Sequence, residues 1–229
     1  FMESVIWAFK QLHDKGLAYE GYRVLPYCWR DQTPLSNHEL RMDDDVYKPR
    51  QDQSVTVTFP LRGEKAQAAE LEGVLALAWT TTPWTVPSNA GLAVHPDLTY
   101  VEVAQDGRRY IVAQDRAEAL FGEDHEVVAT VSGADLVGMR YARPLDLVAM
   151  PEDPQNGWTV VAEDFVSSGD GTGIVHMAPA FGADDYAAGL RHDLPMLNPI
   201  DDAGCFTADV GLVGGQFVKD ADAALVEEL

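Results

Sequence analysis

The sequence predicts a mixed α/β fold that is rich in β-structure and built on a curled or closed sheet. Residues 54–61 alternate apolar side chains with small or polar ones, which is the period-two pattern of a half-buried strand. Residues 98–103 and 109–112 flank Asp106-Gly107, a dipeptide typical of tight hairpin turns. Many further short apolar runs stand between a few helical patterns, and this combination favours a β-rich mixed domain.

The helical patterns are few. One helix is expected over residues 3–17, where apolar side chains recur at helical spacing and Gly16 is placed to end it. Two short helices are expected to begin at Asp115 and Asp220, because aspartate is a favoured N-cap residue. Helical patterns therefore stand near both ends of the chain.

The remaining strands are expected in short apolar runs. These runs are residues 74–79, 127–131, 157–166 and 173–177. Residues 63–73, rich in Glu and Ala, are expected to form a mobile surface loop. The chain starts and stops abruptly within helical patterns, so we expect a piece cut from a longer protein.

The composition is that of a globular protein with an acidic surface. Of the 229 residues, 46% are hydrophobic and 23% are charged, and the formal net charge is -21. This charge argues against a large phosphate-binding surface, because duplex binding needs clustered Lys and Arg, but it permits contact with a few nucleotides. No apolar run reaches the ~18 residues of a membrane span. Two cysteines, Cys28 and Cys205, favour a reducing cytoplasmic setting over a disulfide framework.

The first stretch that carries chemistry is WTTTPWT at residues 79–85. Pro83 restricts the residue before it to an extended conformation, and Pro87 and Asn89 follow soon after. The result is a rigid loop that could hold threonine hydroxyls outward from the end of a strand. Consecutive threonines are also common in strands for packing reasons, so the pattern by itself leaves both interpretations open.

The second stretch is GTGIVH at residues 171–176, followed by a helical pattern over residues 183–191. Asp184 and Asp185 fall in the first turn of that helix, where the helix dipole stabilises negative charge. One of them is therefore an ordinary first-turn carboxylate, whereas the other, if it faces a pocket, stays ionised at neutral pH and suits an ammonium group. His176 lies on an apolar strand, where a packed core histidine is the commoner outcome. The strand ends near the helix, so His176 could line the same cavity.

Other chemistries lack their signatures. No Gly-x-Ser-x-Gly elbow is present, Cys205 has no evident partner base, and the other histidines are scattered without metal-ligand spacing. The alternating glycines at 169–173 only weakly echo the dinucleotide fingerprint, because a strand rather than a helix follows them.

Taken together, the two stretches resemble the editing domain inserted into the catalytic core of isoleucyl-tRNA synthetase, over essentially the whole chain. Further matching segments are Pro34-Leu35-Ser36-Asn37, the strand at residues 54–61 and the tail at residues 215–221. Related enzymes for valine and leucine typically carry Thr-Thr-Arg-Pro-Glu/Asp-Thr where this chain has Thr-Thr-Pro-Trp-Thr at residues 81–85. The resemblance therefore favours the isoleucine branch.

This resemblance implies a barrel-like, β-rich domain with flanking helices. Residues 1–50 would lead from the absent catalytic core, residues 51–205 would form the domain body, and residues 206–229 would return toward the core. The implied activity is hydrolysis of valine mistakenly esterified to isoleucine tRNA. A synthetic pocket sized for isoleucine rejects valine poorly (this pair is itself the standard illustration of that limit), whereas a second, smaller pocket excludes isoleucine by overpacking.

The resemblance also implies individual roles. Asp185 matches the aspartate that grips the substrate α-ammonium, and His176 matches a pocket-wall residue that helps to reject the larger side chain. The matches around the terminal adenosine and the scissile ester are Thr80, Thr81, Thr82 and Asn89, with Trp79 packed beside them. Asp184 matches no essential position and is expected to be the capping residue of the pair.

The expected chemistry is ester hydrolysis by a positioned water without a covalent enzyme intermediate. Asp185 would fix the ammonium, while the threonine hydroxyls and backbone amides would stabilise the oxyanion. No general base is evident, which leaves the vicinal ribose hydroxyl as a hypothesis. Many relatives carry a Cys-x-x-Cys zinc half-site where this chain has Cys28-Trp29-Arg30-Asp31, so we expect no zinc and no cofactor.

The expected partners are the 3′ end of isoleucine tRNA carrying valine and the remainder of the parent synthetase, with a monomeric, cytoplasmic protein and no membrane. Two alternatives stay open. One is a non-catalytic module that docks the tRNA acceptor end, against which the intact Asp185 and His176 argue. The other is an editing domain of the valyl or leucyl branch, with threonyl or norvaline-type esters as targets. Trp84 in place of the acidic residue argues against it.

Overall fold

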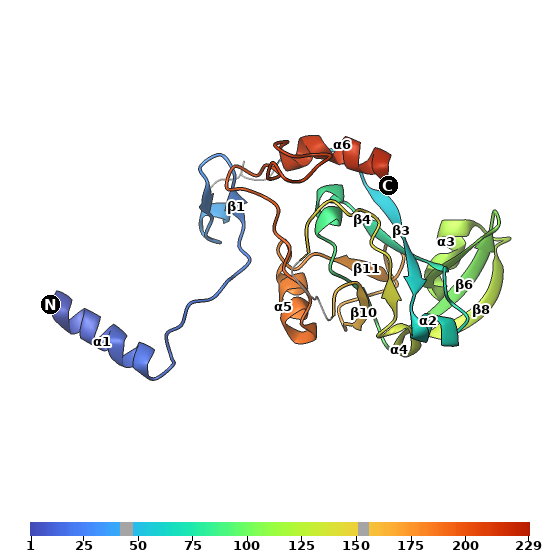
Figure 1. Ribbon diagram of the computed structural model, residues 1–229, viewed down its shortest axis with the longest axis horizontal. Helices are drawn as coiled ribbons and strands as arrows, with labels where there is room; N and C mark the ends of the chain where they lie inside the picture. Colours follow the sequence, from blue (N-terminus) through green and yellow to red (C-terminus); the bar gives the residue numbers. More distant parts are fainter. Residues whose placement is uncertain (42–47, 151–155) are drawn as a thin grey trace.

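The computed structural model describes residues 1–41, 48–150 and 156–229. Within these residues, one large mixed sheet forms the body of the molecule (Figure 1). Its strands are β3 (Val55–Arg62), β4 (Leu75–Thr80), β5 (Gly91–Val94), β6 (Thr99–Gln105), β7 (Arg108–Ala113), β8 (Glu126–Ser132), β9 (Arg140–Tyr141), β10 (Thr159–Ala162) and β11 (Ile174–Met177).

The strand order across this sheet is β11-β5-β10-β9-β3-β4-β7-β6-β8. The pairs β5–β10 and β4–β7 are parallel, and the other neighbours are antiparallel. The sheet curls so far that β11, at one edge, also contacts β4 near its middle. Among the described strands it does not close, because β11 and β8 remain separate edges. The predicted β-rich, mixed α/β fold is confirmed.

Besides the sheet, the described residues form helices and one small hairpin. They are α1 (Met2–Asp14), α2 (Glu64–Ala68), α3 (Ala117–Phe121), α4 (Gly133–Leu136), α5 (Ala183–His192), α6 (Val218–Glu228), the 3-10 helices η1 (Glu39–Arg41), η2 (Pro83–Ser88) and η3 (Gln114–Arg116), and the paired strands β1 (Tyr27–Cys28) and β2 (Thr33–Pro34). No helix in the described part of the chain is long and apolar enough to cross a membrane.

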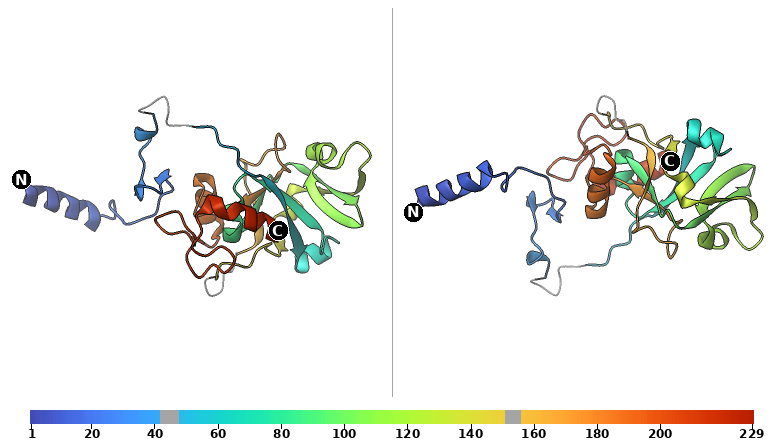
Figure 2. Two further views of the ribbon diagram at one scale, coloured as in Figure 1. Left: turned by 90° about the horizontal axis from the view of Figure 1, so that it is seen from above. Right: turned by 90° about the horizontal axis from the view of Figure 1, so that it is seen from below.

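Helix α1 lies apart from the sheet and buries none of its side chains (Figures 1 and 2). Its C-terminal end has the predicted glycine: Gly16 adopts a φ of 70° and donates its N–H to the His13 carbonyl. Leu17 then donates to the Leu12 carbonyl. Glycine adopts this left-handed conformation without a steric penalty, so the pair of bonds ends the helix as the sequence predicts.

The predicted strand alternation places side chains on two sides of the sheet. In β3, Val57, Phe59 and Leu61 are buried in the main core, with half-buried residues between them. In β4, Ala76 belongs to the main core, whereas the adjacent Leu77 packs into a smaller cluster with Ala117 of α3. A strand with apolar residues on both faces is covered on both faces.

Two helices approach the end of β4 from different directions. Helix α5 packs through Ala188 against a small cluster that contains Ala93 of β5 and Met177 of β11. Helix α6 buries Ala221 and Leu225 in the main core and contacts η2 (Figure 1). Residues far apart in the sequence are therefore brought together near the end of β4.

The predicted hairpin is confirmed. Asp106 and Gly107 link β6 to β7 and adopt φ values of 52° and 76°. Both turn residues lie in the left-handed region, as the two-residue turn that matches strand twist requires. This local signal is strong because few residue pairs tolerate that backbone.

Three local predictions were wrong. Asp115 does not cap a helix but lies within η3, where its carboxylate accepts the Ser168 hydroxyl at 2.9 Å. Asp220 lies in the first turn of α6, whose N-cap is Phe217. Residues 63–73 contain α2 and bury Ala66 and Leu71, so this segment packs against the sheet instead of forming an open loop. The burial of those apolar side chains outweighs the polar composition of the segment.

Candidate active site

A pocket of about 210 Å³ opens where β4 ends, and the two chemistry-bearing stretches meet in it. It is lined by Trp79, Thr80, Thr81, Thr82, Thr85, Val175, His176, Ala178, Phe181 and Asp185. The stretches meet because β11 pairs with β5 and contacts β4 through the curl of the sheet. The volume is below the ~300–1,000 Å³ typical of pockets for drug-sized ligands, so the pocket suits a small group.

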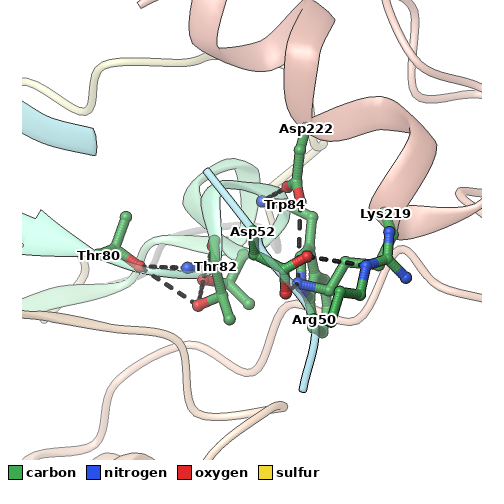
Figure 3. Close-up of polar contacts among 8 residues, drawn as sticks. Arg50, Asp52, Thr80, Thr82, Trp84, Lys219 and Asp222 are labelled. Atoms are coloured by element: carbon green, nitrogen blue, oxygen red, sulfur yellow. Dashed lines mark hydrogen bonds and ion pairs between the residues drawn. The ribbon is translucent and has the colours of Figure 1, made fainter. Parts of the chain in front are cut away.

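The threonine stretch turns directly from the strand into η2. Thr80 Oγ1 accepts the Thr82 N–H at 3.1 Å and lies 3.2 Å from Thr82 Oγ1 (Figure 3). The Thr82 carbonyl accepts both the N–H and the hydroxyl of Thr85, at 3.0 and 2.9 Å. Pro83 occupies the first turn of η2, where its missing N–H is no loss. The hydroxyls of Thr80, Thr82 and Thr85 therefore form a connected cluster. Among the lining threonines, only Thr81 is exposed at the rim.

His176 is held from both ring nitrogens. Asn89 donates its amide Nδ2 to His176 Nδ1 at 2.8 Å, and Thr85 Oγ1 lies 3.0 Å from His176 Nε2. Since Nδ1 accepts, the ring proton resides on Nε2 and is donated to Thr85, whose own hydroxyl proton goes to the Thr82 carbonyl. Burial lowers the pKa of His176 to about 4, so the imidazole is neutral at pH 7. Because both ring nitrogens are engaged in hydrogen bonds, the imidazole serves as a wall of the pocket.

Asn89 lies behind the imidazole and does not line the pocket. It is fully buried, and its carbonyl oxygen accepts the Tyr141 hydroxyl at 2.7 Å. Its amide also donates to the Gly91 carbonyl at 3.0 Å. These partners fix the orientation of the amide, so Asn89 determines which imidazole nitrogen carries the proton.

Asp185 faces the pocket from the first turn of α5. Burial, and then the neighbouring carboxylate of Asp184, raise the pKa of Asp185 to about 6, so the group is mostly ionised at pH 7. Its carboxylate lies over Gly182, where an added Cβ would overlap Oδ2 and come within 2.9 Å of Cγ. A half-buried carboxylate beside a small cavity is suited to a cationic group.

Asp184, by contrast, is exposed on α5. The N-cap of this helix is Gly182, and no side chain caps it. The expectation that Asp184 is the capping residue was therefore wrong. Its exposed carboxylate acts on the pocket only through its charge, which raises the pKa of Asp185.

Trp79 stands at the rim of the pocket, 43% exposed, with its side chain packed over Gly171. Four lining residues were not proposed from the sequence as site residues. They are Thr85, Val175, Ala178 and Phe181. The sequence did contain a signal that Thr85 lines the pocket, because Thr85 follows Thr82 by three residues, which is one turn of a 3-10 helix. Phe181 had none, because it follows β11 in a segment without periodicity.

In the described residues no group of three His, Cys, Asp or Glu side chains is placed to hold a metal ion. Asp31 stands where a second cysteine would complete the half-site, and its carboxylate accepts the Cys28 thiol at 3.2 Å. Cys205 is half-buried elsewhere in the chain and bears a free thiol.

Comparison with known proteins identifies a family. The family model for tRNA synthetases class I (I, L, M and V) matches residues 1–187. Isoleucine–tRNA ligases are 53% identical in Mycobacterium leprae and 48% identical in Leifsonia xyli subsp. xyli, over 232 and 256 residues. These matches cover 100% of this chain but 22% and 23% of the relatives, so the chain spans about a fifth of their length.

A solved structure shares the fold. The crystal structure of GlLeuRS-CP1 superposes with a TM-score of 0.59, covering 76% of this chain and 94% of that one. At 19% sequence identity this likeness concerns the fold alone.

Proposed function

The chain belongs to the class I tRNA synthetases of the isoleucine, leucine, methionine and valine group, and from this premise we propose that it is an editing domain that hydrolyses valine esterified to isoleucine tRNA. The observation that carries this proposal is the pocket at the end of β4. It combines a half-buried carboxylate, a wall of neutral imidazole and a cluster of hydroxyls in a small volume. An α-amino ester presents an ammonium, a short side chain and a polar carbonyl, and these three groups suit that lining.

Charge pairing would hold the amino acid. An α-ammonium placed against Asp185 would donate a charge-assisted hydrogen bond to its carboxylate, whose ionised form burial disfavours. Binding the cation would lower the pKa of Asp185 again, because an opposite charge favours the ionised form. The pairing therefore selects an aminoacyl ester over a simple ester of similar size.

Size selection would depend on His176. Since hydrogen bonds from Asn89 and Thr85 engage both ring nitrogens, the imidazole cannot swing aside without breaking at least one of them. A side chain one methylene longer than valine would have to push against this fixed wall, and such overpacking typically costs about 1–3 kcal/mol. Isoleucine would be excluded on this basis while valine enters.

The hydrolytic step would use positioning more than acid–base catalysis. Water adds its oxygen to the ester carbonyl carbon and the bond to the ribose oxygen breaks. One proton of the water passes to the leaving ribose oxygen, and the other stays with the carboxylic acid that is formed. His176 is neutral with both nitrogens engaged, so it does not take up the proton. The vicinal ribose hydroxyl remains the proposed proton carrier, with Thr81 and Thr82 near the developing oxyanion.

The proposed organisation follows the sequence. Residues 1–50 and 206–229 would connect the domain body, residues 51–205, to a synthetic core, in a cytoplasmic, monomeric enzyme, and α6 of the second segment also packs into the main core of the body. Exposed apolar side chains on α1 are consistent with a covering surface elsewhere in such an enzyme. With a net charge of -21, the domain would hold only the 3′ end of the tRNA and leave the tRNA body to other parts.

The test is deacylation of valyl-, threonyl- and isoleucyl-tRNA, measured with the 229-residue chain and with the longer synthetase that we propose contains it. Valyl ester should be cleaved and isoleucyl ester spared. Asp185→Ala should abolish cleavage, His176→Ala should allow isoleucyl ester to be cleaved, and the exposed Asp184→Ala serves as the matched control. Binding of the acceptor end without turnover would instead indicate a docking module. Preference for threonyl or norvaline-type esters would indicate the valyl or leucyl branch.

A further inference from the structure

The first turn of η2 is completed by a side chain from α6. The first N–H groups of a helix have no acceptor within it, and Pro83 contributes none. The N–H of Trp84 therefore needs an outside acceptor, which the N-cap residue Thr82 does not supply with its side chain. Asp222, which lies 138 positions later in the chain, accepts this N–H with its Oδ1 at 2.8 Å (Figure 3).

Asp222 is itself anchored in a network of charges. It is buried, 6% exposed, and its Oδ2 lies 3.8 Å from the ammonium of Lys219 one turn earlier in α6. Lys219 also pairs with Asp52 at 2.7 Å, and Asp52 with Arg50 at 2.9 Å (Figure 3). The network joins α6, η2 and the segment that leads into β3. A buried carboxylate is costly unless it is paired and hydrogen-bonded, and these partners meet that requirement.

Trp84 connects this network to the pocket. Its indole packs edge-on against Phe181, with ring centroids 4.9 Å apart, and Phe181 lines the pocket beside Asp185. Its indole N–H is buried without a hydrogen-bond partner in the described residues, so packing and the backbone alone hold the ring. The next residue, Thr85, makes the hydrogen bond to His176. A shift of Trp84 would therefore move two walls of the pocket.

We propose that Asp222 is a positioning residue of the pocket, which holds η2 in register by accepting the Trp84 N–H and so keeps Thr85 and Phe181 in place. This inference rests on the proposed function, since the positioned groups are those that would select and orient the aminoacyl ester. Asp222 lies outside the pocket lining and touches no substrate. Its effect would appear as altered turnover and selectivity rather than as lost affinity.

The experiment compares Asp222→Ala and Asp222→Asn with Asp220→Ala, an exposed position on the same helix. Two quantities are measured for each protein: amide hydrogen exchange at Trp84, and kcat and KM for valyl- and isoleucyl-tRNA deacylation. In Asp222→Ala, exchange at Trp84 should accelerate and kcat for the valyl ester should fall about tenfold, as expected when a hydrogen bond to a charged acceptor is lost. KM should change little, and the preference for valyl over isoleucyl ester should narrow.

Asp222→Asn keeps an oxygen acceptor and should restore most of the turnover and the protection, whereas Asp220→Ala should match the unsubstituted chain. Faster exchange at Trp84 with unchanged kcat and selectivity would overturn the proposal, because the contact would then be only structural. Unchanged exchange in a folded Asp222→Ala chain would overturn it as well. If the unsubstituted chain and the longer synthetase both fail to hydrolyse valyl ester, the proposed function fails, while exchange at Trp84 still shows whether Asp222 caps η2.

Discussion

The pocket carboxylate is placed at the expense of fold stability, so Asp185→Asn should stabilise the fold while it removes the proposed deacylation activity. The pKa of Asp185 rises from its ordinary value of 3.8 to about 6 in the folded chain. At 1.36 kcal/mol for each tenfold change in proton affinity, this rise means that the ionised group disfavours folding by at most about 3 kcal/mol. Its side chain is only partly buried and lies at a helix N-terminus, so about 1–2 kcal/mol is the expected gain.

The direction of the pH dependence of stability follows from how many protons the folded and unfolded states bind at Asp185. Between pH 3.8 and 6 the folded state holds more protons at Asp185 than the unfolded state, so the contribution of Asp185 to the stability of the unsubstituted chain becomes less favourable through this range as pH rises. Asparagine has the same shape and does not titrate. The stability difference between Asp185→Asn and the unsubstituted chain should therefore be near zero below pH 4, grow up to pH 6 and stay constant above it. Urea unfolding of both proteins at a series of pH values measures this difference.

Asp184→Asn provides the matched control, because it removes the same charge one residue away from an exposed position. It should change the free energy of unfolding by a few tenths of a kcal/mol at most, as is usual for surface substitutions. The reasoning is refuted if Asp185→Asn is less stable than the unsubstituted chain at pH 7, or if its gain does not vary with pH.

Three further predictions follow from the same geometry. The proposed valyl-tRNA deacylation, measured as kcat/KM, should rise with pH as Asp185 ionises, reach half of its maximum near pH 6 and level off above about pH 7, and a flat profile from pH 5 to 7 would contradict this. Because burial lowers the pKa of His176 from 6.5 to about 4, the contribution of this residue to stability should be fully present above pH 6.5 and should fall by roughly 3 kcal/mol as pH drops to 4. His176→Gln should remove this contribution, which the difference between the two proteins measures in the same unfolding series. Gly182→Ala should reduce deacylation at least about tenfold, because the added Cβ displaces the Asp185 carboxylate, whereas Gly211→Ala, with no atom within 4 Å of its added Cβ, should leave the rate unchanged. Equal rates for these two glycine variants would argue against the assigned carboxylate position.

The features that the sequence alone determined are those that short segments encode. The alternation in residues 54–61 appears as β3, and Asp106-Gly107 forms the predicted turn, because strand periodicity and left-handed turn residues act over a few positions. The same holds for the two stretches of the pocket. Local composition predicted the chemistry of residues 79–85 and 171–176, and the structure brings both stretches to one cavity.

Other features were decided only by the tertiary structure. The Trp84 N–H donates to Asp222, 138 positions away, and the sequence around neither residue predicts this hydrogen bond. The position of Asn89 close to the threonines in the sequence predicts a pocket residue, yet the curl of the sheet places it behind His176. The shifted pKa values of His176 and Asp185 likewise depend on burial, which is a property of the packed chain. Backbone propensity acts over a few residues, whereas desolvation and hydrogen-bond partners depend on distances in space, and only folding sets those distances.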